Sequence, residues 1–143
     1  MKKIIGLTAI AFFLATIFIS CKKNDTATSN TLPTSTVVTQ GTWKVTYYNN
    51  SGANETTNYT GYSFIFVSGG SVSAISGSLV TNGTWNSYND DSQNKLYINL
   101  GSTPPLSKLK ADWHIIEKTS VLIRLEDVSG GSSATDYLTF EKI

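Results

Sequence analysis

The amino-acid sequence predicts an all-β fold, an eight-stranded antiparallel up-and-down barrel, for the region from Gly41 to Ile143. Three observations support this prediction. Apolar and polar side chains alternate along eight short segments, clusters of glycine, asparagine and serine separate the segments, and the connections between them are short. Short connections place successive strands side by side and antiparallel, and closure into a barrel removes the unpaired edges that an open sheet would leave. A two-sheet β-sandwich is the alternative arrangement.

Four strands are expected in the first half of this region, at residues 42–49, 59–67, 71–75 and 79–88. The pair Gly69-Gly70 is expected to form the tight turn between the second and the third strand. The pair Asn82-Gly83 lies directly before Thr84-Trp85. It is therefore either a hairpin turn or a bulge within one long strand.

Four more strands are expected at residues 95–100, 111–118, 121–126 and 135–143. The segment Thr103-Pro104-Pro105 must lie in a connection, because proline has no N–H group to donate within a sheet. A loop rich in glycine and serine is expected at residues 127–134.

The aromatic side chains are expected either to line a ligand cavity or to form the core. The candidates are Trp43, Tyr47, Tyr62, Phe64, Phe66, Trp85 and Trp113. An eight-stranded barrel is just wide enough to hold one small ligand or to be filled by its own side chains. Three tryptophans in a small β domain most often belong to its core, because each of them buries a large area.

The N-terminus is expected to be a lipoprotein signal peptide. Met1-Lys2-Lys3 is positively charged, and the apolar run at residues 4–19 is typical of a secretory signal. The run ends at Ile19-Ser20-Cys21, which resembles the lipobox of bacterial lipoproteins. The resemblance implies transfer of a diacylglyceryl group to the Cys21 thiol, removal of residues 1–20, and acylation of the new amino group. An ordinary signal peptide and an uncleaved membrane helix are the alternatives.

Residues 21–40 are expected to be the lipidated cysteine and a disordered tether, because threonine and serine dominate this segment. Lys22 and Lys23 follow the anchor in place of aspartate, which by family analogy implies the outer membrane, on its periplasmic side or at the cell surface. The sequence Asp25-Thr26-Ala27 is similar to the O-glycosylation sequon of Bacteroidota, so Thr26 is a candidate glycosylation site.

The domain resembles the lipocalin or calycin superfamily, in particular the short lipocalin-like domains of Bacteroidota lipoproteins. The resemblance rests on Gly41-Thr42-Trp43 at the head of the first strand, on eight meandering strands and on a final strand at the C-terminus. It implies a barrel that binds a small hydrophobic ligand in the cell envelope. Secreted lipocalins place an arginine of the last strand over the tryptophan ring. Here Arg124, on the seventh expected strand, either caps Trp43 or lies exposed beside Glu126.

Composition argues against several functions. Without Lys2 and Lys3, nine basic side chains stand against ten acidic ones, and Arg124 is the sole arginine, so no nucleic-acid partner is expected. Cys21 is the single cysteine and has no partner for an internal disulfide.

His114 is the sole histidine, and it is interpreted as structural because no nucleophile or set of metal ligands accompanies it in a recognisable spacing. We therefore expect a protein that is not an enzyme and that has no cofactor and no metal. It would bind a small hydrophobic ligand. The alternative is a filled barrel that acts as a structural module, or as one that binds a protein or a glycan.

Overall fold

The computed structural model describes residues 32–128 and 134–143. Their elements, in chain order, are α1 (Thr34–Val38), β1 (Thr42–Asn50), β2 (Ala53–Asn54), η1 (Thr56–Tyr59), β3 (Tyr62–Val67), β4 (Ser71–Ser76), β5 (Leu79–Asp90), β6 (Gln93–Asn99), η2 (Leu106–Leu109), β7 (Ala111–Lys118), β8 (Leu122–Asp127) and β9 (Asp136–Lys142). The predicted signal peptide, Cys21, Thr26 and most of the glycine-serine loop lie outside the described residues.

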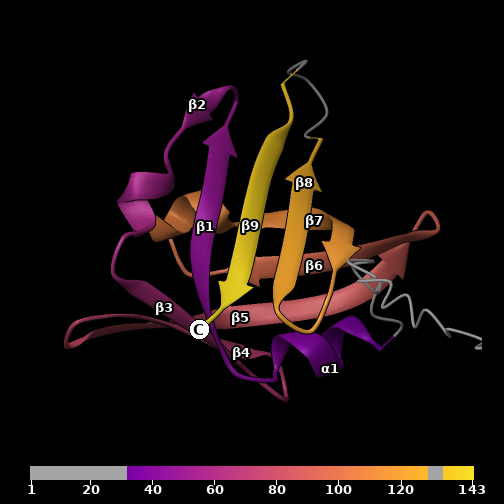
Figure 1. The fold of residues 1–143 in the computed structure, drawn as a ribbon, viewed down its shortest axis with the longest axis horizontal. Helices are drawn as coiled ribbons and strands as arrows, with labels where there is room; N and C mark the ends of the chain where they lie inside the picture. Colours follow the sequence, from indigo (N-terminus) through magenta and orange to yellow (C-terminus); the bar gives the residue numbers. More distant parts are fainter. Residues whose placement is uncertain (1–31, 129–133) are drawn as a thin grey trace, which may run out of the picture.

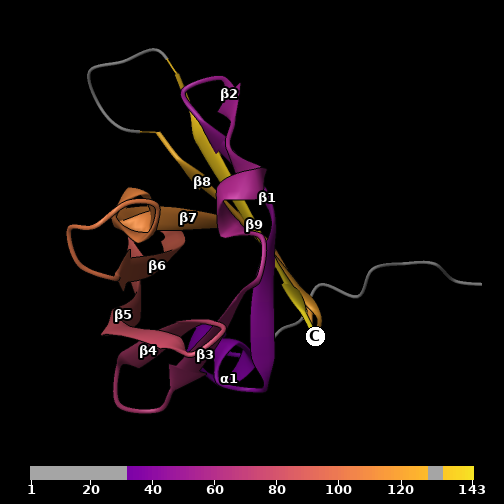
Figure 2. The same ribbon diagram turned by 90° about the vertical axis from the view of Figure 1, so that its left-hand side faces the viewer.

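The strands form a closed antiparallel barrel, as the alternation predicted. Neighbours pair in the order β2, β1, β3, β4, β5, β6, β7, β8, β9, and β1 also pairs with β9, which closes the sheet. Since β2 is a two-residue addition to the end of β1, eight strands make up the barrel. Figure 1 shows β1, β9 and β8 side by side at the front, with β3 to β7 crossing behind them. Figure 2 shows these front strands nearly edge-on.

The β1 strand contains a bulge that changes which side chains face inward. Its register against β9 is regular from Trp43 to Val45, shifts between Val45 and Tyr47, and is regular again beyond Tyr47. The extra residue restarts the alternation, so Tyr48 points into the barrel and is 1% exposed, whereas Tyr47 is 40% exposed. The expectation that Tyr47 lines a cavity or belongs to the core is therefore wrong.

The pair Asn82-Gly83 lies within β5 and makes neither a hairpin nor a bulge. Asn82 and Gly83 pair in regular register with Ser73 and Val72 of β4, and β6 begins to pair with β5 only at Thr84. A Cβ atom on Gly83 would lie 2.0 Å from the carbonyl oxygen of Asn99. Glycine is therefore required where β5 passes from one partner strand to the next.

Helix α1 corrects the expected extent of the tether. Thr34–Val38 is helical, and Val37 and Val38 are fully buried. The Trp43 indole N–H donates a hydrogen bond of 2.8 Å to the Val38 carbonyl. The folded domain thus includes a segment that was assigned to the tether, and α1 lies across the lower end of the barrel in Figures 1 and 2.

The η2 segment is fixed to the barrel by aromatic side chains from three elements. The Trp113 indole N–H donates to the Leu109 carbonyl at 2.9 Å. The hydroxyls of Tyr48 and Tyr59 donate at 3.0 Å to the carbonyls of Lys108 and Pro105. Because of these bonds, the η2 carbonyls and the indole and hydroxyl groups keep hydrogen-bond partners where the aromatic rings are buried.

Candidate functional site

Most of the aromatic side chains that were singled out in the sequence belong to the core. Trp43, Phe64, Phe66, Trp85 and Trp113 are buried, and Tyr62 is partly buried against them. The Trp85 indole N–H donates to the Val67 carbonyl at 3.0 Å, so each tryptophan has a backbone acceptor. In the described residues, no buried side-chain nitrogen or oxygen lacks a hydrogen-bond partner.

Aromatic rings occupy the centre of the barrel in edge-to-face contact. The Phe140 ring centroid lies 5.3 Å from that of Phe64 and 5.8 Å from that of Phe66, and Phe66 in turn lies 5.8 Å from Trp85. Such T-shaped pairs are favourable beyond the area that they bury. The interior is thus built from interlocked side chains of β3, β5 and β9.

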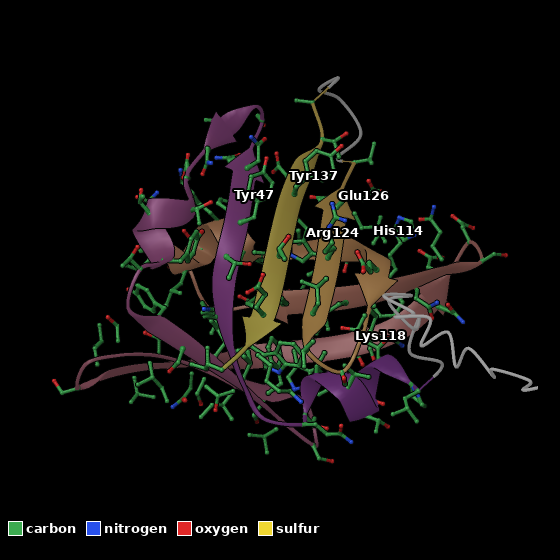
Figure 3. The ribbon with its side chains drawn as sticks, in the orientation of Figure 1. Tyr47, His114, Lys118, Arg124, Glu126 and Tyr137 are labelled. Carbon is green, nitrogen blue, oxygen red and sulfur yellow. The ribbon has the colours of Figure 1, made fainter. Side chains whose placement is uncertain are left out.

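A hollow on the outside of the barrel gathers the side chains most suited to binding. It has a volume of about 650 Å³ and lies over β1, β9 and β8. We call this surface the tyrosine face; its residues are Thr46, Tyr47, Leu122, Arg124, Tyr137, Thr139 and Glu141. Figure 3 shows Tyr47, Tyr137 and Arg124 on these front strands.

Strand register fixes the layout of the tyrosine face. Tyr47 on β1 is opposite Thr139 on β9, and Thr139 is opposite Arg124 on β8. Tyr137 lies two residues from Thr139 along β9, so the two tyrosines are diagonal neighbours on one face. Tyr47 is 40% exposed and Tyr137 is 38% exposed, which leaves part of each ring open to a ligand.

Charged groups surround the two rings. The Arg124 Nη1 atom lies 3.2 Å from Glu117 Oε2, and both side chains are partly open to water. The earlier alternatives for Arg124 are thereby resolved: its carboxylate partner is Glu117, and the cation over the Trp43 ring is Lys142 of β9, at 5.4 Å from the ring centroid. An exposed ion pair of this kind contributes little to stability.

His114 borders the tyrosine face without forming part of its lining. Its Nδ1 atom lies 2.9 Å from Glu126 Oε1, and the two residues are opposite each other on β7 and β8. No group of three or more His, Cys, Asp and Glu side chains that could hold a metal ion is found in residues 32–128 and 134–143.

A second hollow, of about 750 Å³, lies between α1 and the turn from β3 to β4. We call it the helix groove; its residues are Ser35, Thr36, Thr39, Gln40, Ser68, Gly69, Gly70, Trp85, Asn86 and Ser87. Its lining offers hydroxyl and amide groups but no ionised side chain. Trp85 is only 6% exposed there, so it presents little ring surface to a ligand.

Sequence reasoning missed the tyrosine face because the β1 bulge is not visible in the alternation of Trp43, Val45 and Tyr47. One signal was present: Tyr137, Thr139 and Glu141 alternate along the last strand and share a face.

Within the described part of the chain, no helix has the length and apolar character needed to cross a membrane.

No protein-family model matches this sequence, and no curated protein matches it. The structure is similar to the crystal structure of a DUF4847 family protein from Bacteroides vulgatus ATCC 8482, with a TM-score of 0.52 and 16% sequence identity. The match covers 78% of this chain and 98% of that protein. At this level of identity the comparison establishes a shared fold.

Proposed function

We propose that this protein is a lipoprotein of the outer membrane whose lipocalin-like barrel is filled by its own side chains and serves as a binding module through its outer surface. The observation that carries the proposal is the set of interlocked rings of Phe64, Phe66 and Phe140 at the centre of the barrel. This observation favours surface binding over the carriage of a small hydrophobic ligand inside.

The packing of the interior gives the physical reason. Phe64 and Phe140 are 0% exposed and Phe66 is 2% exposed, so a ligand inside would have to displace them. Removing a packed phenylalanine from a core typically costs about 3–5 kcal/mol, and displacing one without removing it loses many of the same contacts. An apolar ligand would have to offset that loss before any net binding appeared.

Membrane anchoring rests on the lipobox at Cys21. Ten residues lie between Cys21 and Leu32, and the eleven residue steps from one to the other span at most about 40 Å when the chain is fully extended. Lys118 donates hydrogen bonds to the Leu32 carbonyl and to Thr34 Oγ1, and its burial lowers its pKa. The α1 end of the barrel would therefore stay near the bilayer. In Figure 3, Tyr47 and Tyr137 lie toward the opposite end from α1 and Lys118.

Two further features support the lipocalin-like and non-enzymatic parts of the proposal. Lys142, on the last strand, takes the place over Trp43 that an arginine takes in secreted lipocalins. His114 contacts the carboxylate of Glu126, an arrangement that fits a structural pair on adjacent strands. Binding at the surface requires neither a cofactor nor a reactive group.

Titration with an uncharged apolar fluorophore, N-phenyl-1-naphthylamine, tests the filled interior. The wild-type protein is expected to give no saturable signal, whereas Phe140→Ala opens a cavity and gains one. Phe66→Leu serves as a milder variant if Phe140→Ala does not fold, and Tyr47→Ala is the matched control outside the barrel. Saturable binding of one equivalent by the wild type would overturn the proposal.

Anchoring is tested separately by expressing wild type and Cys21→Ser in a bacterial host that processes lipoproteins. The wild type is expected in the outer-membrane fraction, with a mature N-terminus at acylated Cys21. The variant should lose both labelling by radioactive palmitate and this location. Equal labelling of the two proteins would show that Cys21 is not the anchor.

A further inference from the structure

We propose that the tyrosine face binds an uncharged oligosaccharide, with the rings of Tyr47 and Tyr137 stacked against two sugar units. This inference rests on the proposed function and names the chemical class of its ligand. Both rings lie on the outside of the barrel, belong to one hollow and are diagonal neighbours on adjacent strands. The hollow of about 650 Å³ lies within the usual range of ligand sites, roughly 300–1,000 Å³.

The rings suit the faces of a sugar. A pyranose has an apolar face of C–H groups and a rim of hydroxyls, and it can lie flat on an aromatic ring while its hydroxyls reach sideways. Tyrosine supplies a rigid apolar ring with a polar hydroxyl at its tip. Diagonal neighbours on antiparallel strands are about 7–8 Å apart, so two units of one chain can contact Tyr47 and Tyr137 together.

The polar side chains of the hollow match the hydroxyls of such a ligand. Arg124 supplies only donors, Glu141 supplies only acceptors when ionised, and the hydroxyls of Thr46 and Thr139 supply both. A sugar hydroxyl both donates and accepts, so it can satisfy each of these groups. A purely apolar ligand would instead cover the charges of Arg124 and Glu141 without replacing their hydrogen bonds to water.

Charge argues against an anionic ligand. Arg124 already contacts Glu117 at 3.2 Å, and Glu141 lines the same hollow. An anion placed on the two tyrosine rings would be attracted by one arginine and repelled by these carboxylates. An uncharged glycan meets no such opposition.

The polarity of the face argues against a protein partner. Charged residues are depleted at the centre of a stable protein interface. Here Thr139 and Glu141 lie on β9, the middle strand of the face, and Arg124 lies opposite Thr139 on β8, so polar and charged groups lie among the aromatic rings. The surface is that of a site for a small ligand.

The test uses the full-length lipidated protein in detergent and an array of soluble uncharged oligosaccharides, such as gluco-, xylo-, manno- and galacto-oligosaccharides of two to six units. Hits are measured by calorimetry with wild type, Tyr47→Ala, Tyr137→Ala and Tyr47→Phe. Tyr88→Ala is the matched control, because Tyr88 is an exposed tyrosine on β5 outside the tyrosine face.

We expect at least one oligosaccharide to bind, with affinity falling about tenfold in each alanine variant. Tyr47→Phe keeps the ring and should retain most of the affinity, and Tyr88→Ala should leave it unchanged. Binding that is equally strong in both alanine variants would overturn the assignment to this face. The absence of any hit would overturn the glycan proposal. This result would leave the filled interior of the proposed function untouched, because the titration with the apolar fluorophore tests the interior independently of any glycan.

Discussion

Removing α1 should cost this domain much of its stability. The perturbation is a chain that starts at Gln40, one residue before the domain boundary that the sequence alone predicts. It loses Val37 and Val38, which are both 0% exposed, and full burial of a valine contributes about 1.5–3 kcal/mol. It also leaves the Trp43 indole N–H without the Val38 carbonyl, at a cost of about 1–3 kcal/mol. Together these terms come to roughly 4–9 kcal/mol, against a usual total stability of about 5–15 kcal/mol.

Urea unfolding followed by tryptophan fluorescence measures this loss. The chain from Gln40 is compared with a chain from Leu32, which keeps α1, and with Ser35→Ala in the longer chain, which changes an exposed position of the same helix. The shorter chain should unfold at a much lower urea concentration or be unfolded in buffer. Equal midpoints for the two chains would refute the assignment of α1 to the folded domain.

Three further predictions concern single positions. Gly83→Ala should destabilise the domain by about 3 kcal/mol or more in the same urea assay, because the new Cβ atom would meet the Asn99 carbonyl. Gly77 has a φ of +58° and open space around it, so the control Gly77→Ala should cost only about 1–2 kcal/mol. Burial, followed by the nearby carboxylates of Asp136, Glu55 and Asp127, raises the pKa of Tyr48 from 10.0 to about 12. Folding thus favours the neutral Tyr48 hydroxyl, so its contribution to the free energy of unfolding is complete below pH 10 and is lost between pH 10 and 12, at about 1.4 kcal/mol per pH unit. Tyr48→Phe should flatten this part of the profile of stability against pH. An unchanged slope would contradict the raised pKa of Tyr48. Lys142→Ala should cost about 0.5–1 kcal/mol in thermal unfolding through loss of the cation over Trp43, and Lys142→Arg should retain it; equal effects of the two changes would exclude a cation–π contribution.

The strands could be predicted from the sequence because most of them alternate buried and exposed side chains and turn residues separate them. Two-residue alternation therefore located all eight barrel strands, and short connections implied their antiparallel order. The two-residue strand β2 was missed, since it pairs only with the end of β1 and buries no side chain.

The β1 bulge could not be predicted, because Trp43, Val45 and Tyr47 alternate as they would in a regular strand. The choice between Tyr47 and Tyr48 is made by tertiary contacts. The Tyr48 ring lies 5.2 Å from that of Tyr59 and 6.4 Å from that of Trp113, and its hydroxyl reaches the Lys108 carbonyl. These partners are far away in the sequence, so a local pattern does not contain them.

Helix α1 was missed for a related reason. Its five residues, Thr-Ser-Thr-Val-Val, have low helix propensity and are too few to show a helical period. The helix is held by burial of its two valines and by the Trp43 indole. The role of Gly83 was equally hidden, because it depends on the close approach of a neighbouring strand.

A barrel that is filled by its own side chains, and that recognises a ligand on its outer surface, should carry no apolar molecule inside. Native mass spectrometry of the lipidated protein, purified from its own host's envelope and exchanged into a mild detergent, measures whether it does. We predict a mass that corresponds to the acylated chain from Cys21 to Ile143, with no apolar molecule recovered by solvent extraction beyond the attached acyl groups. A stoichiometric apolar molecule that survives detergent exchange and leaves only on unfolding would contradict the account and establish the protein as a carrier.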